Sequence, residues 1–160
     1  MTTETLTVPT WTPPKWLNGM MKVLLRTPGL QNWIGKSIAL ITFTGRRSGK
    51  SYSTPVTYYR EGDTVIVLSK KFRTWWRNFL EEPQVELRLK GRTLRGRAHV
   101  GIGDEADLPA LVTFLENRRM DAKAYGVTFT PEGRIRQEEA RAILPQIVII
   151  RITLGSLRLG

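Results

Sequence analysis

A short basic segment, Gly45-Arg-Arg-Ser-Gly-Lys-Ser51, carries the groups best suited to binding an anion. Its cations can form charge-assisted hydrogen bonds to phosphate or carboxylate groups, and its glycines let the backbone approach a ligand closely. The segment is not a P-loop, because the spacing between Gly45 and Gly49 is one residue short and a β-branched run containing proline follows instead of a helix. We therefore expect an anion-binding turn between two strands.

The segments around this turn predict mainly β structure. Alternating or β-branched runs joined by short turns predict six strands, over 37–44, 52–60, 64–70, 84–90, 93–102 and 145–155. Strands in this order do not alternate with long helices, so a doubly wound α/β fold is not expected. The pattern indicates an α+β, mainly β fold: a closed or partly closed barrel of about six mostly antiparallel strands.

Helices are expected at the start of the chain and in its second half. The pattern of apolar residues predicts an amphipathic helix over 14–26. A short helix capped by Thr74 and a long helix over 104–125 capped by Asp104 should follow, with a charged helix or turn over 131–144. Residues 1–13 are rich in Thr and Pro and are expected to be flexible, which leaves 14–160 as a single domain.

Composition excludes several classes of site. The 160 residues include no cysteine and one histidine, His99, which falls within a predicted strand. Thiol chemistry, disulfides and a metal site built from His or Cys are therefore not expected. The formal net charge is +11, and between residues 45 and 97 we count 13 Lys or Arg against 5 Asp or Glu. This surplus favours an anionic partner, although no nucleic-acid-binding motif accompanies it and nucleic acid is not the expected one.

The resemblance to a known family rests on two stretches, ITFTGRRSGKSYSTPVTYYREGDTVIVLSK and WWRNFLEEPQVELRLKGR. Their T-G-R-R-S-G, T-P, S-K and W-W-x-N elements resemble the deazaflavin (coenzyme F420)-dependent nitroreductase family of actinobacteria, a branch of the flavin/deazaflavin oxidoreductases with a split β-barrel. The likeness is closest over residues 37–100. It implies the same split barrel here, with an N-terminal amphipathic helix and C-terminal helices.

The resemblance also implies a cofactor and a reaction. F420 has a flavin-like ring, a phosphodiester and an anionic oligoglutamate tail, and FMN is the alternative cofactor. A hydride would pass from the reduced ring to a hydrophobic small molecule: a quinone, an unsaturated lipid or a nitro compound. Tyr125 is the candidate for the substrate pocket, and no catalytic acid is assigned. The implied cofactor-binding residues are Arg46, Arg47, Ser48, Gly49, Lys50, Ser51, Thr54, Pro55, Ser69, Lys70, Trp76 and Asn78.

Several alternatives stay open. Many family members have a glycine-containing insertion after S-K, and the short SKKFRTWW segment lacks it. A lipid- or fatty-acid-binding protein of the same fold that has lost its cofactor is therefore a second hypothesis. Trp76 can line the site or anchor the core. The helix over 14–26 can pack on the barrel or lie on an anionic membrane surface.

The sequence also bears on where the protein is located and how it assembles. The first residues do not resemble a signal peptide and no apolar run is long enough to span a membrane, so a cytoplasmic protein is expected, either free or peripheral at the inner face of the membrane. Both a monomer and a homodimer are compatible with the family.

Overall fold

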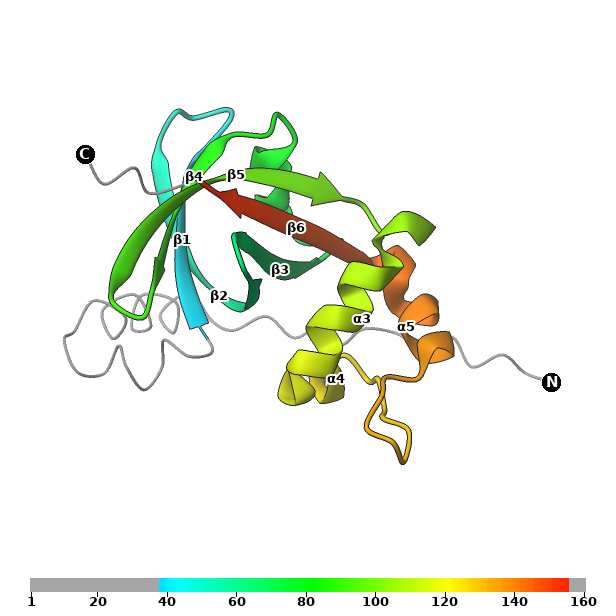
Figure 1. The fold of residues 1–160 in the computed structure, drawn as a ribbon. Coiled ribbons are helices and arrows are strands. Elements are labelled where there is room, and N and C mark those ends of the chain that lie inside the picture. The colour runs from blue at the N-terminus through cyan, green and yellow to red at the C-terminus, as the bar shows by residue number, and fades with distance from the viewer. Residues whose placement is uncertain (1–37, 156–160) are drawn as a thin grey trace.

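The computed structural model describes residues 38–155, in which six antiparallel strands form a closed barrel in the order β1-β2-β3-β6-β5-β4. The barrel confirms the predicted mainly β fold, and the α-helices between β5 and β6 gather at one end of it (Figure 1). The predicted helix over 14–26 lies outside the described residues. The strands are β1 (Ile38–Thr44), β2 (Ser51–Glu61), β3 (Thr64–Lys70), β4 (Gln84–Leu89), β5 (Arg92–Gly101) and β6 (Ile147–Leu154).

Two tight turns set the register of the hairpins. In the turn between β4 and β5, Lys90 and Gly91 have φ of 49° and 75°, as a two-residue turn with both central residues in the left-handed region requires. In the basic turn between β1 and β2, the Gly45 N–H donates to the Lys50 carbonyl at 2.8 Å. The Gly49 N–H donates back to the Gly45 carbonyl at 2.9 Å, which closes this turn on itself.

Strand β6 connects two apolar cores because both of its faces are buried. Val148 and Ile150 belong to the core inside the barrel. Ile147 and Ile149 belong to a second core, between the barrel and the helices. Successive residues of a strand point to opposite faces, so the apolar run IVII at the start of β6 places one strand in both cores.

The helical part contains shorter pieces than the sequence predicted. The single helix expected over 104–125 is three elements, and it breaks at Arg118, whose φ of −132° and ψ of 71° are not helical. Of the two expected caps, Asp104 is confirmed, since it forms a capping box with Asp107, whereas Thr74 makes no side-chain capping bond to the helix that follows it. The elements are η1 (Trp75–Phe79), η2 (Glu105–Asp107), α3 (Leu108–Asn117), α4 (Arg119–Ala124), α5 (Gln137–Ile143) and η3 (Leu144–Gln146). Within the described part of the chain, no helix has the length and hydropathy needed to cross a bilayer.

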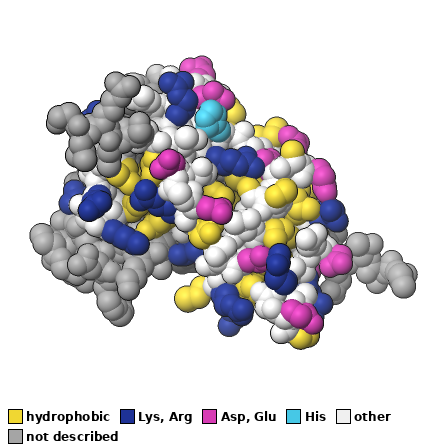
Figure 2. Space-filling view, in the orientation of Figure 1, with side chains coloured by type: hydrophobic (Ala, Val, Ile, Leu, Met, Phe, Trp, Pro, Cys, Tyr) yellow, Lys and Arg dark blue, Asp and Glu magenta, His cyan; other side chains and the backbone are white. Residues whose placement is uncertain are grey.

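The histidine lies where the sequence predicted, in a strand. His99 belongs to β5, and its Nδ1 is 3.1 Å from Oε1 of Glu82 in the segment that leads into β4. The space-filling view shows it next to acidic side chains on the surface (Figure 2). No cluster of three or more metal-binding side chains occurs among the described residues.

Strands β2 and β3 pair over only part of their lengths and separate beyond it. Tyr58 to Glu61 of β2 pair with Thr64 to Val67 of β3. In the preceding part of β2, residues 51–57 pair with β1. In the following part of β3, residues 68–70 pair with β6. The facing edges of these two segments therefore form no ladder with each other. Pro55, which has no N–H to donate, lies in this part of β2, as expected for a strand with a free edge.

Replacing Gly103 should test the connection between barrel and helices. Gly103 has φ of 85°, and an added Cβ would collide with the backbone carbonyls of Leu144 and Ile147. Gly62 has φ of 57° but nothing within 4 Å of such a Cβ. Gly62→Ala should cost about 1–2 kcal/mol of unfolding free energy through backbone conformation alone, and Gly103→Ala distinctly more. Equal losses in denaturant unfolding would contradict the packing described here.

Candidate functional site

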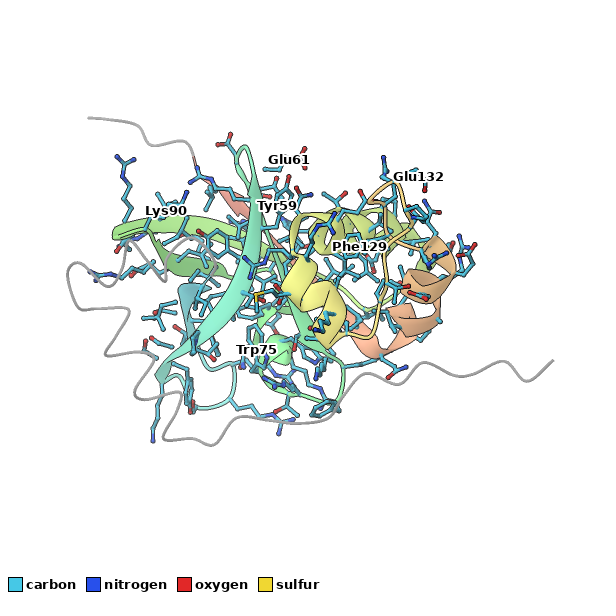
Figure 3. The ribbon with its side chains drawn as sticks, turned by 90° about the horizontal axis from the view of Figure 1, so that it is seen from below. Tyr59, Glu61, Trp75, Lys90, Phe129 and Glu132 are labelled. Atoms are coloured by element: carbon cyan, nitrogen blue, oxygen red, sulfur yellow. The ribbon has the colours of Figure 1, made fainter. Side chains whose placement is uncertain are left out.

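A pocket occupies the gap between β2 and β3, and we call it the split pocket. Its volume is about 160 Å³. One wall is the free edge of β2 and the other is the end of β3, with η1 and the residue after α4 closing it. Figure 3 shows Trp75 on the side of the barrel where α4 lies. The lining residues are Thr54, Pro55, Val56, Thr57, Leu68, Ser69, Lys70, Arg73, Trp75 and Tyr125.

The split pocket is positively charged. Lys70 and Arg73 line it, and none of its described lining residues is acidic. Burial, followed by the neighbouring Arg73, lowers the pKa of Lys70 below its ordinary value. The Nε of Arg73 is buried and has no hydrogen-bond partner among the described residues. Because a buried polar group without a partner is costly, these features favour an anionic or strongly hydrogen-bonding ligand.

Tyr125 and Trp75 are the aromatic residues that line the split pocket. Burial, reinforced by the nearby Asp121 carboxylate and opposed by Arg73, raises the pKa of Tyr125 to about 12. Its ring centroid lies 5.8 Å from the Lys70 Nζ, within reach of a cation–π interaction. The phenol therefore stays protonated at neutral pH and can donate a hydrogen bond into the pocket.

A second, more open pocket lies beside the basic turn, and we call it the turn pocket. It has a volume of about 390 Å³ and is lined by Gly45, Arg46, Arg47, Ser48, Tyr52, Thr74, Arg77 and Asn78. Tyr52 and Thr54 lie two residues apart on β2 and line the turn pocket and the split pocket respectively. Thr74 lines the turn pocket, whereas its neighbours Arg73 and Trp75 line the split pocket. The two pockets are therefore adjacent parts of one basic groove.

Asn78 joins the basic turn to η1. Its Oδ1 accepts from the Arg46 N–H at 2.9 Å, and its Nδ2 donates to the Trp75 carbonyl at 2.8 Å. Both ends of the amide are used within the protein, so the structure gives Asn78 a positioning role beside the turn pocket. Ser48 is engaged as well, since its Oγ lies 3.1 Å from the Tyr52 hydroxyl and accepts from the Lys50 N–H at 3.2 Å.

The two adjacent tryptophans of η1 have different surroundings. Trp76 is 7% exposed, belongs to the core inside the barrel and donates from Nε1 to the Lys71 carbonyl at 3.3 Å. Trp75 is half-buried and lines the split pocket. Of the two readings of Trp76, the geometry therefore favours the core anchor, and Trp75 takes the place in the site.

The structure brings most of the expected cofactor residues together. Arg46, Arg47, Ser48 and Asn78 lie at the turn pocket, and Thr54, Pro55, Ser69, Lys70 and Tyr125 lie at the split pocket. Gly49 and Lys50 are exposed in the turn but line neither pocket, and Ser51 lines a separate hollow with Thr44 and Gln84. The polar or aromatic lining residues that sequence reasoning missed are Tyr52, Thr57, Arg73, Thr74, Trp75 and Arg77, and the apolar Val56 and Leu68 were missed as well. Two signals pointed to them: the i, i+2 spacing on β2 and the cations flanking the tryptophan pair.

The chain matches a known protein family over most of its length. Residues 20–128 match the profile of the F420H(2)-dependent quinone reductase family. The chain belongs to this family. Its members are F420-dependent reductases, in agreement with the relationship and the cofactor expected from the sequence. Comparison with curated proteins gives no significant match.

Solved structures support the fold of this F420H2-dependent quinone reductase family member. An FAD-binding protein from Mesorhizobium loti has a TM-score of 0.53 at 12% identity and covers 85% of this chain and 87% of its own. The heme storage protein HutZ from Vibrio cholerae has a TM-score of 0.52 at 11% identity and covers 75% and 82%. General Stress Protein 26 from Bacillus anthracis has a TM-score of 0.50 at 16% identity and covers 86% and 88%. At these identities the likeness concerns the fold alone.

Matched substitutions of the tryptophans should separate core from site. Trp76→Ala should lower the unfolding free energy by about 3–5 kcal/mol, the usual cost of emptying a buried aromatic position. Trp75→Ala should cost less stability, yet it should weaken F420 binding because it removes a wall of the split pocket. Denaturant unfolding and fluorescence titration measure the two effects. If Trp75→Ala left the affinity for F420 unchanged while Trp76→Ala in folded protein reduced it, the assignment of these residues would be reversed.

Proposed function

We propose that this chain binds F420H2 along the basic groove, with the ring in the split pocket and the anionic tail at the turn pocket, and reduces a quinone-type acceptor. The observation that carries the proposal is that the two pockets are lined by neighbouring residues, one pocket being small and partly aromatic and the other open and cationic. A ligand with a flat ring at one end and several negative charges at the other matches this order of groups.

The residues present fit such a cofactor. Arg46, Arg47 and Arg77 line the turn pocket, whose described lining residues include no carboxylate. They can bind phosphate or carboxylate groups through charge-assisted hydrogen bonds. In the split pocket, the unpartnered Nε of Arg73 and the phenol of Tyr125 offer donors to polar ring atoms or to a phosphate. Trp75 offers an aromatic surface against which a ring can pack.

The protein's part in the reaction is to bind, orient and exclude water. The reduced deazaflavin supplies a hydride when bound, and reactions of this kind depend on how the protein positions donor and acceptor. Pro55, Val56 and Leu68 give the split pocket an apolar component from which water is easily displaced. The Tyr125 hydroxyl can donate a hydrogen bond to a carbonyl oxygen of an acceptor held against the ring. A quinone presents such an oxygen and is therefore preferred to an unsaturated lipid.

Removing two cations of the basic turn should test where the tail binds. Arg46→Ala combined with Arg47→Ala should weaken F420 binding at least roughly tenfold, since charged hydrogen bonds contribute about 1.5–3 kcal/mol each but solvent screens exposed groups. The matched control is Lys90→Ala with Arg92→Ala. The strand register places that hairpin at the end of the barrel opposite the basic turn. Fluorescence titration measures both affinities, and equal weakening in both double variants would show a general charge effect instead of a tail site.

The salt dependence of binding should separate F420 from FMN. Raising ionic strength shortens the Debye length from about 10 Å at 0.1 M to about 3 Å at 1 M. Affinity for F420 should therefore fall steeply with salt, because several tail charges are held by exposed cations. FMN has one phosphate and should show a shallower slope. Parallel slopes would indicate that the turn pocket does not hold the tail, and tighter binding of FMN at every salt concentration would make FMN the better cofactor assignment.

A further inference from the structure

A partly buried carboxylate links the helical part to the free edge of β2. Asp121 on α4 accepts a hydrogen bond through Oδ1 from the Thr57 hydroxyl at 3.0 Å. Through Oδ2 it accepts from Arg118 Nε at 2.8 Å, and both side chains of this ion pair are 15% exposed. Each carboxylate oxygen therefore has a defined donor, and the low exposure limits the screening that weakens surface ion pairs.

Thr57 connects this hydrogen bond to the split pocket. Thr57 lines the split pocket and lies in the part of β2 that has no ladder with β3. The helical part otherwise meets the barrel mainly through an apolar core, apart from the ion pair at 3.2 Å between Asp107 of η2 and Arg151 of β6, and apolar burial is not directional. The hydrogen bond from Thr57 to Asp121 is directional, so it fixes one point of α4 against one point of β2.

Asp121 is bonded to the residues at both ends of α4, to Arg118 through its carboxylate and to Tyr125 through its backbone carbonyl. Arg118 occupies the break between α3 and α4, so its bond to Asp121 sets the direction in which the second helix leaves the first. One turn later the Tyr125 N–H donates to the Asp121 carbonyl at 2.9 Å. Residues four apart share a helix face, so Asp121 and Tyr125 both face the barrel, one against Thr57 and the other at the split pocket.

We infer that Asp121 is a positioning residue that ties α4 to β2 and thereby holds Tyr125 in the wall of the split pocket. It touches neither cofactor nor acceptor in this scheme and acts through Thr57 and Tyr125. The inference rests on the proposed function for the ring's place in the split pocket, but the tether itself is independent of any ligand.

The first experiment measures the tether in the full-length protein without ligand. Asp121→Ala should speed amide hydrogen exchange over residues 119–126 by roughly tenfold or more, since it removes two hydrogen bonds to a charged group. Thr57→Val should give a smaller increase in the same segment, because the bond to Arg118 remains. The matched control is Glu116→Gln. Glu116 accepts from Arg134 Nε at 2.8 Å and from the Ile135 N–H at 3.2 Å within the helical part, away from β2.

The second measurement reports on the phenol itself. The ultraviolet titration difference between a protein and its Tyr125→Phe counterpart isolates Tyr125 among the four tyrosines of the chain. Asp121→Asn should lower the pKa of Tyr125, because the charge that raises it is removed. This variant keeps the size of the side chain, so it stays informative if Asp121→Ala fails to fold. Glu116→Gln should leave the titration unchanged.

The third measurement connects the tether to the pocket. The probe is 5-deazariboflavin, which has the ring but neither phosphate nor tail. Asp121→Ala or Asp121→Asn should weaken this probe and F420 by the same factor, whereas loss of the turn cations should weaken F420 alone. The inference would be overturned if the folded Asp121 variants exchanged their amide hydrogens over residues 119–126 at the wild-type rate. It would also be overturned if exchange were faster but the affinity for 5-deazariboflavin were unchanged. If neither ligand bound the wild-type protein, the proposed function would fail, and the exchange and titration results would still decide whether the tether exists.

Discussion

The separation of β2 from β3 is the constraint on which the site depends, because it leaves two strand edges facing each other without a shared ladder. Backbone groups on a free edge need partners, and the space between the edges must be filled by side chains or by a ligand. Here the gap receives η1 from one side and the end of α4 from the other. The opening is tolerated because each strand keeps its other neighbour, β1 for β2 and β6 for β3.

The groove concentrates positive charge, because none of the described residues that line either pocket is acidic. Burial, followed by the nearby Arg73 cation, lowers the pKa of Lys70. In the proposed function an anionic ligand would lie against this charge, and a ligand that binds only the folded state stabilises that state by mass action.

Much of the fold could be predicted from the sequence, while the site could be predicted only in part. The strands followed from alternation and turn residues, which are local signals. The choice between Trp75 and Trp76 did not, because neighbouring residues of a short helix point in different directions and only the packing of η1 on the barrel decides which one faces the core. The break at Arg118 was missed for a related reason: Asp121, to which Arg118 is bonded, also accepts from Thr57 on β2, which lies far away in the sequence.

The raised pKa of Tyr125 limits what this residue can do in a reduction. A general acid is most effective when its pKa lies near the working pH, and a phenol with a pKa of about 12 is far from neutral. Its proton is held firmly, which favours a hydrogen bond to a developing negative charge on an acceptor oxygen over full transfer of the proton. The charge of Asp121, which helps to raise this pKa, also belongs to the tether that holds the residue in place. Burial and this charge together raise the pKa of the phenol, and the same carboxylate would hold it in position, so in the proposed reaction the proton that completes reduction of the acceptor would come from solvent once the acceptor leaves the pocket.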